Sequence, residues 1–130
     1  MAEIELQNIA HSYNPQAADK TYALDPFNMT WIDGGRYAIL GPSGCGKTTM
    51  LNIMSGIVQP SEGKLLFDGV DVTTLSTSER NIAQVFQFPV IYGTMTVEQN
   101  LAFPLVCRNY EKFVIDAKVQ EVAEALSLQG

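Results

Sequence analysis

The 130-residue sequence is poor in cysteine, histidine and positive charge, and it lacks a long apolar run. Its two cysteines, Cys45 and Cys107, are typical of free thiols in a reducing compartment rather than of a disulfide-stabilised secreted domain. Eight basic against fourteen acidic residues give a formal net charge of −6, which argues against a nucleic-acid-binding surface. No run reaches the ~18 apolar residues of a membrane span, and the acidic start differs from a secretory signal. We therefore expect a cytoplasmic globular protein without a nucleic acid partner.

The most informative stretch runs from Gly41 to Thr48 and fits the phosphate-loop pattern G-x-x-x-x-G-K-[ST]. The apolar run 37–40 precedes it and predicts a buried strand, and the apolar run 49–54 follows it and predicts a helix. The succession of strand, loop and helix is the context in which this pattern holds phosphate. A glycine-rich turn that carries a lysine by chance is the alternative, and it leaves the agreement of the three elements unexplained.

Each residue type in this stretch suits a polyphosphate ligand. Glycines let the backbone come close to an anion, and successive N–H groups then face it together with the positive end of the helix dipole. Lys47 is expected to reach the β- and γ-phosphates, and the Thr48 hydroxyl is expected to ligate Mg²⁺. The predicted nucleotide contacts in this stretch are Gly41, Pro42, Ser43, Gly44, Cys45, Gly46, Lys47, Thr48 and Thr49.

Patterns before and after the loop predict a mixed α/β architecture. Residues 1–35 contain short alternating apolar segments joined by turns too short for crossover helices, so they predict an antiparallel β region. Residues 36–87 predict the phosphate-loop core, which adds strands over 64–67 and 82–86. A capping box that begins at Ser76 predicts a helical turn between these two strands.

The last third of the sequence, residues 88–130, predicts helices. A helix is expected to start at Thr96, and Pro104 is expected to interrupt it. Residues 111–129 carry apolar side chains at helical spacing, which predicts an amphipathic helix whose stripe packs into a core. This region is a separate part of the same predicted domain.

Three further features resemble the nucleotide-binding subunit of an ABC transporter, of the importer type. Tyr13 closes the first predicted strand, Gln87 ends a strand 40 residues after Lys47, and the segment 95–105 follows. The resemblance covers nearly the whole chain. It implies an α/β P-loop NTPase fold, with an incomplete RecA-like core, an N-terminal antiparallel β subdomain and the start of a helical subdomain.

The resemblance implies ATP and Mg²⁺ as ligands and gives roles to matching positions. Tyr13 would stack on the adenine ring, and Gln87 would ligate Mg²⁺ or the attacking water. Lys47 and Gln87 are thus the catalytic candidates, and Thr48 and Gln87 are the metal ligands. The alternatives are a half-buried strand tyrosine at position 13 and a polar strand end at position 87. Residues Val90–Val97 would contact the membrane permease, unless these apolar residues pack in a core.

The resemblance also implies a partner set and a location. ATPase subunits would form a homo- or heterodimer on the inner face of the plasma membrane, bound through the permease. ATP hydrolysis would drive solute uptake, and the segments 81–87 and 100–105 resemble importers of carbohydrates or polyols, with glycerol as one candidate.

Several features of the family have no counterpart here, namely the L-S-G-G-Q signature, the Asp-Glu pair after a strand and the switch histidine. The single histidine, His11, precedes the phosphate loop. We therefore expect residues 1–130 to be the N-terminal part of a longer ATPase, able to bind ATP but lacking the general base. A small-molecule kinase and a nucleotide-binding module without catalysis are the alternatives.

Overall fold

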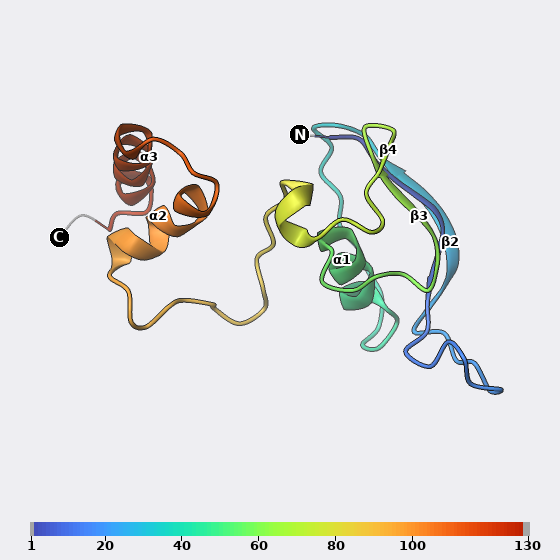
Figure 1. Ribbon diagram of the computed structural model, residues 1–130. Helices are drawn as coiled ribbons and strands as arrows, with labels where there is room; N and C mark the ends of the chain where they lie inside the picture. Colours follow the sequence, from blue (N-terminus) through green and yellow to red (C-terminus); the bar gives the residue numbers. More distant parts are fainter. Residues whose placement is uncertain (1, 129–130) are drawn as a thin grey trace. The chain divides into compact units, whose positions relative to one another are not determined.

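The computed structural model describes residues 2–128 and divides the chain after Gln84 into two units (Figure 1). The first unit contains an antiparallel sheet with the strand order β2-β1-β3-β4, which confirms the predicted antiparallel β region. Its strands are β1 (Ile4–His11), β2 (Leu24–Trp31), β3 (Glu62–Phe67) and β4 (Val70–Asp71), and its helices are α1 (Lys47–Ser55) and the short 3₁₀ helix η1 (Thr77–Arg80). The second unit contains α2 (Val97–Cys107) and α3 (Lys112–Ala125).

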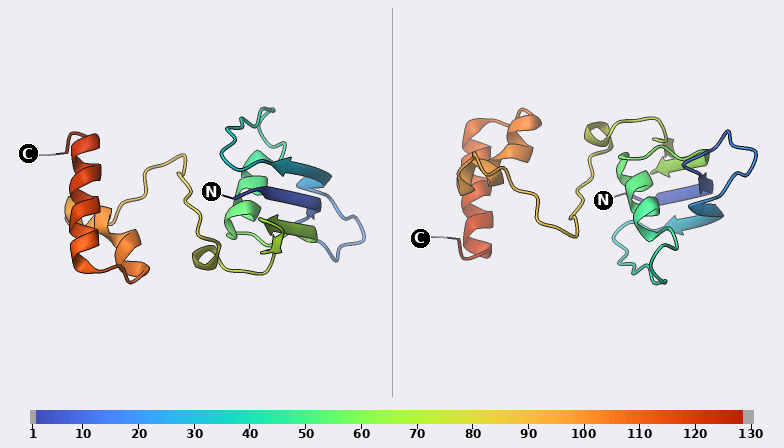
Figure 2. Two further views of the ribbon diagram at one scale, coloured as in Figure 1. Left: turned by 90° about the horizontal axis from the view of Figure 1, so that it is seen from above. Right: turned by 90° about the horizontal axis from the view of Figure 1, so that it is seen from below.

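Helix α1 covers one face of the sheet, as Figures 1 and 2 show. The core between them consists of apolar side chains from both sides, and a fully buried Leu or Ile contributes about 1.5–3 kcal/mol. Gly56 ends α1 in the left-handed conformation, and its N–H donates to the Ile53 carbonyl at 3.2 Å, as in a C-cap. The buried core residues are Leu6, Ile9, Met50, Ile53, Met54, Leu65 and Val72.

Strand β1 contains a bulge at Asn8, whose φ is 49°. The bulge interrupts the two-residue alternation, so Leu6 and Ile9 are both buried although three positions separate them. Asn28 satisfies the bulge, since its Oδ1 accepts the Asn8 N–H at 2.9 Å. On the other side, a Cβ at Gly63 would lie 2.3 Å from the Asn8 carbonyl oxygen, so only glycine fits there. The bulge therefore redirects the end of β1, where the candidate site begins.

Arg80 holds the C-terminal end of α1 in place. Its side chain is buried with 4% exposure, and its Nη1 donates to the carbonyls of Ile53 at 2.7 Å and Met54 at 3.2 Å. Its Nε and Nη2 donate to the carbonyls of Leu75 and Thr73, both at 3.0 Å. Burial lowers the pKa of this guanidinium. A cation at the negative end of a helix dipole is favourable, so Arg80 anchors α1 at its C-terminus.

Two predicted strands, 37–40 and 82–86, do not form. Leu40 is 91% exposed and Val85 is 97% exposed, so neither lies in a core. A buried strand is stable when neighbouring strands satisfy its N–H and C=O groups. Within residues 2–128, no strand pairs with either segment, and the apolar composition alone does not hold them extended in a sheet.

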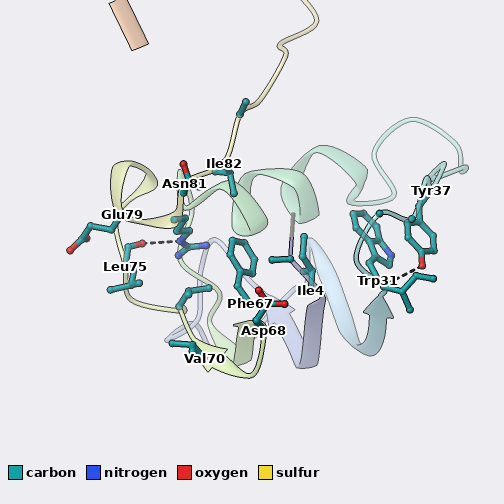
Figure 3. A pocket seen from close by; sticks show the side chains of 17 residues that line it. Ile4, Trp31, Tyr37, Phe67, Asp68, Val70, Leu75, Glu79, Asn81 and Ile82 are labelled. Atoms are coloured by element: carbon teal, nitrogen blue, oxygen red, sulfur yellow. Dashed lines mark hydrogen bonds between the residues drawn. The ribbon is translucent and has the colours of Figure 1, made fainter. Parts of the chain in front are cut away.

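A hollow of about 640 Å³ with both apolar and polar lining opens beside the sheet in the first unit (Figure 3). Ile4 and Phe67 line its middle. At one end Trp31 and Tyr37 stack with ring centroids 5.2 Å apart, and the Tyr37 hydroxyl accepts the Ile32 N–H at 3.0 Å. The segment before the phosphate loop is therefore held by the Tyr37 side chain rather than by strand pairing.

The second unit is a pair of packed helices. Thr96 caps α2, because its hydroxyl accepts the Gln99 N–H at 3.1 Å and the Gln99 side chain accepts the Thr96 N–H at 2.9 Å. This capping box confirms the predicted helix start. The prediction that Pro104 interrupts the helix is wrong, since α2 continues to Cys107. Capping and packing against α3 hold the helix despite the one hydrogen bond that proline removes.

The apolar stripe of α3 is only half-buried at Ile115 and Val119 and is exposed at Val122 and Leu126. Neither α2 nor α3 has a fully buried residue among those described, so the expected core is not complete in this unit. Within residues 2–128, every helix is too short or too polar to span a bilayer.

The two failed strand predictions lead to a stability test. Leu40→Ser is expected to change the free energy of unfolding by less than about 0.5 kcal/mol, because Leu40 is exposed. Leu65→Ala is the matched control and is expected to cost about 2–5 kcal/mol, because Leu65 is fully buried. Urea unfolding followed by tryptophan fluorescence measures both. A loss above about 2 kcal/mol for Leu40→Ser would show that 37–40 is a buried strand after all.

Candidate functional site

The glycine-rich loop enters α1 through two left-handed residues, Gly44 with φ 79° and Gly46 with φ 94°. Gly46 also passes close to the start of β2, since a Cβ there would lie 2.6 Å from the Ala23 carbonyl oxygen. Both the dihedral angle and the contact exclude a larger residue at this position. The sheet thus fixes where α1 begins.

The backbone N–H groups of the loop and of the first turn of α1 are largely free. Within residues 2–128 they have no acceptor, apart from Cys45, which donates to the Pro42 carbonyl at 3.3 Å. The hydrogen bonds along the helix begin only at Met50, whose N–H donates to the Gly46 carbonyl at 2.9 Å. Free N–H groups at a helix N-terminus form a binding site for an anion. The unpaired donors are Ser43, Gly44, Gly46, Lys47, Thr48 and Thr49.

Lys47 lies over this loop. Its Nζ donates to the Gly41 carbonyl at 2.6 Å and to the Pro42 carbonyl at 2.7 Å, and it lies 3.6 Å from the Cys45 Sγ. These acceptors are uncharged and exposed, so a phosphate oxygen offers the ammonium a stronger, charge-assisted bond. The Lys47 ammonium therefore contacts three of the predicted phosphate-binding residues, Gly41, Pro42 and Cys45.

Tyr13 lies beside the same helix. Its hydroxyl is 3.3 Å from the Thr49 Oγ1, in the first turn of α1, and its side chain is 63% exposed. The His11 ring packs against it with centroids 4.6 Å apart and planes at 88°. Tyr13 follows the end of β1, so it is not the half-buried strand residue of the alternative interpretation. The structure places an exposed aromatic ring next to the predicted phosphate loop.

The two predicted metal ligands belong to different units. Thr48 is exposed in the first turn of α1, and its hydroxyl has no hydrogen-bonding partner within residues 2–128. Gln87 belongs to the second unit, and its approach to Lys47 and Thr48 stays a prediction. Residues 2–128 hold no group of three or more histidine, cysteine or carboxylate side chains that suits a metal ion.

The predicted permease contact, Val90–Val97, lies in the second unit and is largely exposed. Val90 and Ile91 are exposed, whereas the Tyr92 ring packs on Phe103 with centroids 4.8 Å apart. The Asn100 side chain holds this segment, because its Oδ1 accepts the Tyr92 N–H at 2.9 Å. None of the residues from 90 to 97 is buried in the described part of this unit, and their role as a partner surface stays a prediction.

Sequence reasoning missed the residues that support the site from behind. His11 is buried under Tyr13, Ser61 contacts it from the turn before β3, and Arg80 anchors the far end of α1. The one available signal was the position of His11 in the sequence, two residues before Tyr13. Ser61 and Arg80 are brought to the site only by the tertiary fold.

Comparison with known proteins gives consistent matches. The ABC transporter family profile matches residues 24–130. The trehalose import ATP-binding protein SugC of Mycobacterium tuberculosis is 42% identical over 98% of this chain and 32% of its own length. The spermidine/putrescine import ATP-binding protein PotA of Clostridioides difficile is 39% identical, and the sn-glycerol-3-phosphate import ATP-binding protein UgpC of Burkholderia thailandensis is 38% identical. Each match covers 98% of this chain, and 35% and 34% of the respective relative. The chain thus spans about a third of the length of these relatives.

Solved structures agree with the sequence relatives. A dimeric bacterial ABC transporter cassette matches with a TM-score of 0.80 and 29% identity, over 95% of this chain and 56% of that chain. A dimeric ATP-binding cassette in a post-hydrolysis state, bound to ADP and Pi, matches with a TM-score of 0.79 and 28% identity, with the same coverage of both chains. These matches confirm the predicted α/β P-loop NTPase fold.

The geometry at Gly46 leads to a pair of variants. Gly44→Ala introduces only the strain of a positive φ, because nothing lies within 4 Å of its Cβ position, and it is expected to cost about 1–2 kcal/mol. Gly46→Ala is expected to cost more, because its methyl group also displaces the Ala23 carbonyl. Urea denaturation of both variants measures the difference. Equal losses would show that β2 does not constrain the start of α1.

Proposed function

The chain belongs to the ABC transporter family, and we propose from this membership that it binds ATP as part of an importer's ATPase subunit. The observation that carries the proposal is the set of free N–H groups between Ser43 and Thr49, with the Lys47 ammonium over them. Family membership argues against the small-molecule kinase alternative. It is compatible with nucleotide binding without hydrolysis.

The triphosphate would take its place in the loop. Amides at the start of α1 would donate to phosphate oxygens, and the helix dipole would favour the negative charge. Lys47 would exchange its two carbonyl acceptors for phosphate oxygens, and the resulting bonds are about twice as strong as neutral ones.

The residues near the phosphate site offer Mg²⁺ few protein ligands. The free Thr48 hydroxyl offers one oxygen ligand at the edge of the phosphate site, and no cluster of carboxylates within residues 2–128 competes for the ion. Such a donor set suits Mg²⁺, which keeps several waters and binds mainly to substrate phosphates. In our proposal Gln87 adds a second side-chain oxygen. The ion would neutralise charge on the phosphates.

Tyr13 would supply the base contact. Its exposed ring lies beside α1, within reach of a nucleotide whose phosphates occupy the loop. Stacking on an aromatic ring contributes about 1–3 kcal/mol in nucleic-acid systems. Adenine would therefore bind to the tyrosine ring while the phosphates bind to the backbone.

The partners of the proposed subunit follow from its relatives. The trehalose and glycerol phosphate proteins are import ATP-binding proteins, and a related cassette forms a dimer. We propose a dimer of ATPase subunits on the inner face of the plasma membrane, with a permease bound at Val90–Val97. A carbohydrate or polyol solute is part of this proposal, although a polyamine importer has a similar identity.

Hydrolysis is expected to be negligible for residues 1–130 alone. Phosphoryl transfer needs several positioned groups at once, and the sequence contains no signature motif and no Asp-Glu pair that follows a strand. Lys47 and Gln87 are the catalytic candidates that it does contain. ATP binding without appreciable turnover is therefore the activity that we expect.

Lys47→Ala tests the proposed function. The variant should lose at least about tenfold in affinity for a fluorescent ATP analogue, because a bond to a charged group contributes about 1.5–3 kcal/mol. Its free energy of unfolding without nucleotide should fall by less than about 1 kcal/mol, since the carbonyl bonds that it loses are exposed. Titration with and without Mg²⁺ and urea unfolding measure the two quantities.

Lys64→Ala is the matched control, because Lys64 is an exposed lysine in β3 outside the site. It should leave affinity and stability unchanged. An unchanged affinity in Lys47→Ala would contradict the proposed function, and a large loss of stability would assign Lys47 a structural role.

A further inference from the structure

His11 is a buried imidazole at the end of β1, directly behind the candidate site. It is 8% exposed, it pairs with Leu24 of β2, and its carbonyl accepts the Ala23 N–H at 2.9 Å. Its ring lies perpendicular to the Tyr13 ring at 4.6 Å, which is a favourable geometry for two aromatic rings. Filling the core does not explain why a polar ring, that of His11, is buried against the exposed ring of Tyr13.

Ser61 holds the imidazole in place. Its Oγ accepts the Ser12 N–H at 3.0 Å, donates to the Ser12 carbonyl at 3.1 Å and lies 3.4 Å from the His11 Nδ1. A hydroxyl has one proton to donate, and the tautomer of His11 sets whether that proton goes to Nδ1 or to the Ser12 carbonyl. The Ser61 N–H also donates to the Ala10 carbonyl at 2.9 Å. The turn before β3 is thus bound to the end of β1 on both sides of His11.

The imidazole is held from this one side. Its Nε2 has no hydrogen-bonding partner within residues 2–128, although it is buried. Leaving a buried polar atom unpaired is unfavourable, so an apolar ring would pack here at a lower cost. The contacts that His11 does make are to Ser61 and to Tyr13.

The Tyr13 ring is held at two points. His11 packs on the ring, and the hydroxyl meets the Thr49 Oγ1 at 3.3 Å. The side chain nevertheless remains 63% exposed, so a flat partner has access to it. An exposed side chain that is already fixed loses less conformational entropy on binding.

The long loop after Tyr13 is fixed to the same turn. Lys20 forms an ion pair with Glu62, and the Tyr22 hydroxyl donates to the Glu62 Oε1 at 2.8 Å. The carboxylate raises the pKa of Lys20, and the ammonium lowers the pKa of Glu62. Glu62 follows Ser61 directly, so the loop and the His11 contact share one support.

We propose that His11 is a positioning residue that orients the Tyr13 ring and so sets the affinity of the site for the base of a nucleotide rather than for its phosphates. This inference depends on the proposed function, in which Tyr13 stacks on adenine. His11 itself contacts no phosphate-loop residue through a hydrogen bond within residues 2–128. Its removal therefore affects the base side of the site selectively.

The test compares ATP with inorganic tripolyphosphate, which has the phosphates but no base. Isothermal titration of the 130-residue chain with each probe, in the presence of Mg²⁺, gives two affinities for each variant. His11→Ala should weaken ATP binding about 3- to 10-fold, in line with the strength of an aromatic pair, and should leave tripolyphosphate within about twofold. His11→Phe keeps the ring packing but loses the Ser61 contact, so it should recover part of the ATP affinity.

A second background makes the test specific. In Tyr13→Ala, which lacks the ring that His11 orients, the further change His11→Ala should leave ATP affinity within about twofold. Equal losses of both probes in His11→Ala, or a further loss of ATP in the Tyr13→Ala background, would overturn the inference, as would an unchanged ATP affinity in His11→Ala. If His11→Ala does not fold, His11→Phe takes its place. Affinities of His11→Phe for ATP and tripolyphosphate in the wild-type ratio would support the ring contact, and loss of binding to both probes would overturn the inference.

The two levels of the proposal fail differently. A wild-type chain that binds neither probe contradicts the phosphate site itself, and with it the proposed function. A wild-type chain that binds both probes equally, with Tyr13→Ala unchanged, keeps the phosphate site and overturns the positioning role of His11.

Discussion

The structure depends on a short helix whose first N–H groups have no partner. A nine-residue helix is marginal on its own, so α1 needs tertiary support. The core against the sheet supplies it along the side, and Arg80 supplies it at the C-terminal carbonyls. With the helix fixed in this way, the glycine-rich loop holds free amides in an exposed position rather than folding them into further intrahelical bonds. The donors are unpaired because the first N–H groups of a helix have no intrahelical acceptor, and the anchoring of α1 holds them in place.

The part of the site proposed to bind the base also depends on residues that pack beneath it. The bulge at Asn8 redirects β1, His11 and Ser61 fix its end, and the Tyr13 ring reaches α1 at Thr49. The antiparallel sheet therefore serves both parts of the site, since it carries the core under α1 and the supports of the tyrosine. A ring and a set of amides held by one rigid sheet keep their spacing, which suits a ligand with a base at one end and phosphates at the other.

Local signals in the sequence predicted the parts of the fold that depend on neighbouring residues. The phosphate loop, the helical turn after Ser76 and the helix start at Thr96 each involve residues within a few positions of one another. The predicted strands at 37–40 and 82–86 do not form, because an apolar run indicates burial but does not show which strand would pair with it. The predicted helix break at Pro104 was wrong for a different reason: capping and helix packing outweigh the hydrogen bond that this proline removes. Ser61 and Arg80 act across 50 and 27 positions, beyond the reach of a periodic pattern.

The central claim is that the amides from Ser43 to Thr49 bind a polyphosphate. The most direct measurement is a ¹H–¹⁵N correlation spectrum of the labelled chain during titration with tripolyphosphate and Mg²⁺. We expect large shifts at Gly44, Gly46 and Lys47, which have free N–H groups, and small shifts in β3. Saturable shifts elsewhere with none in this loop, or no saturable shift at all, would contradict the claim.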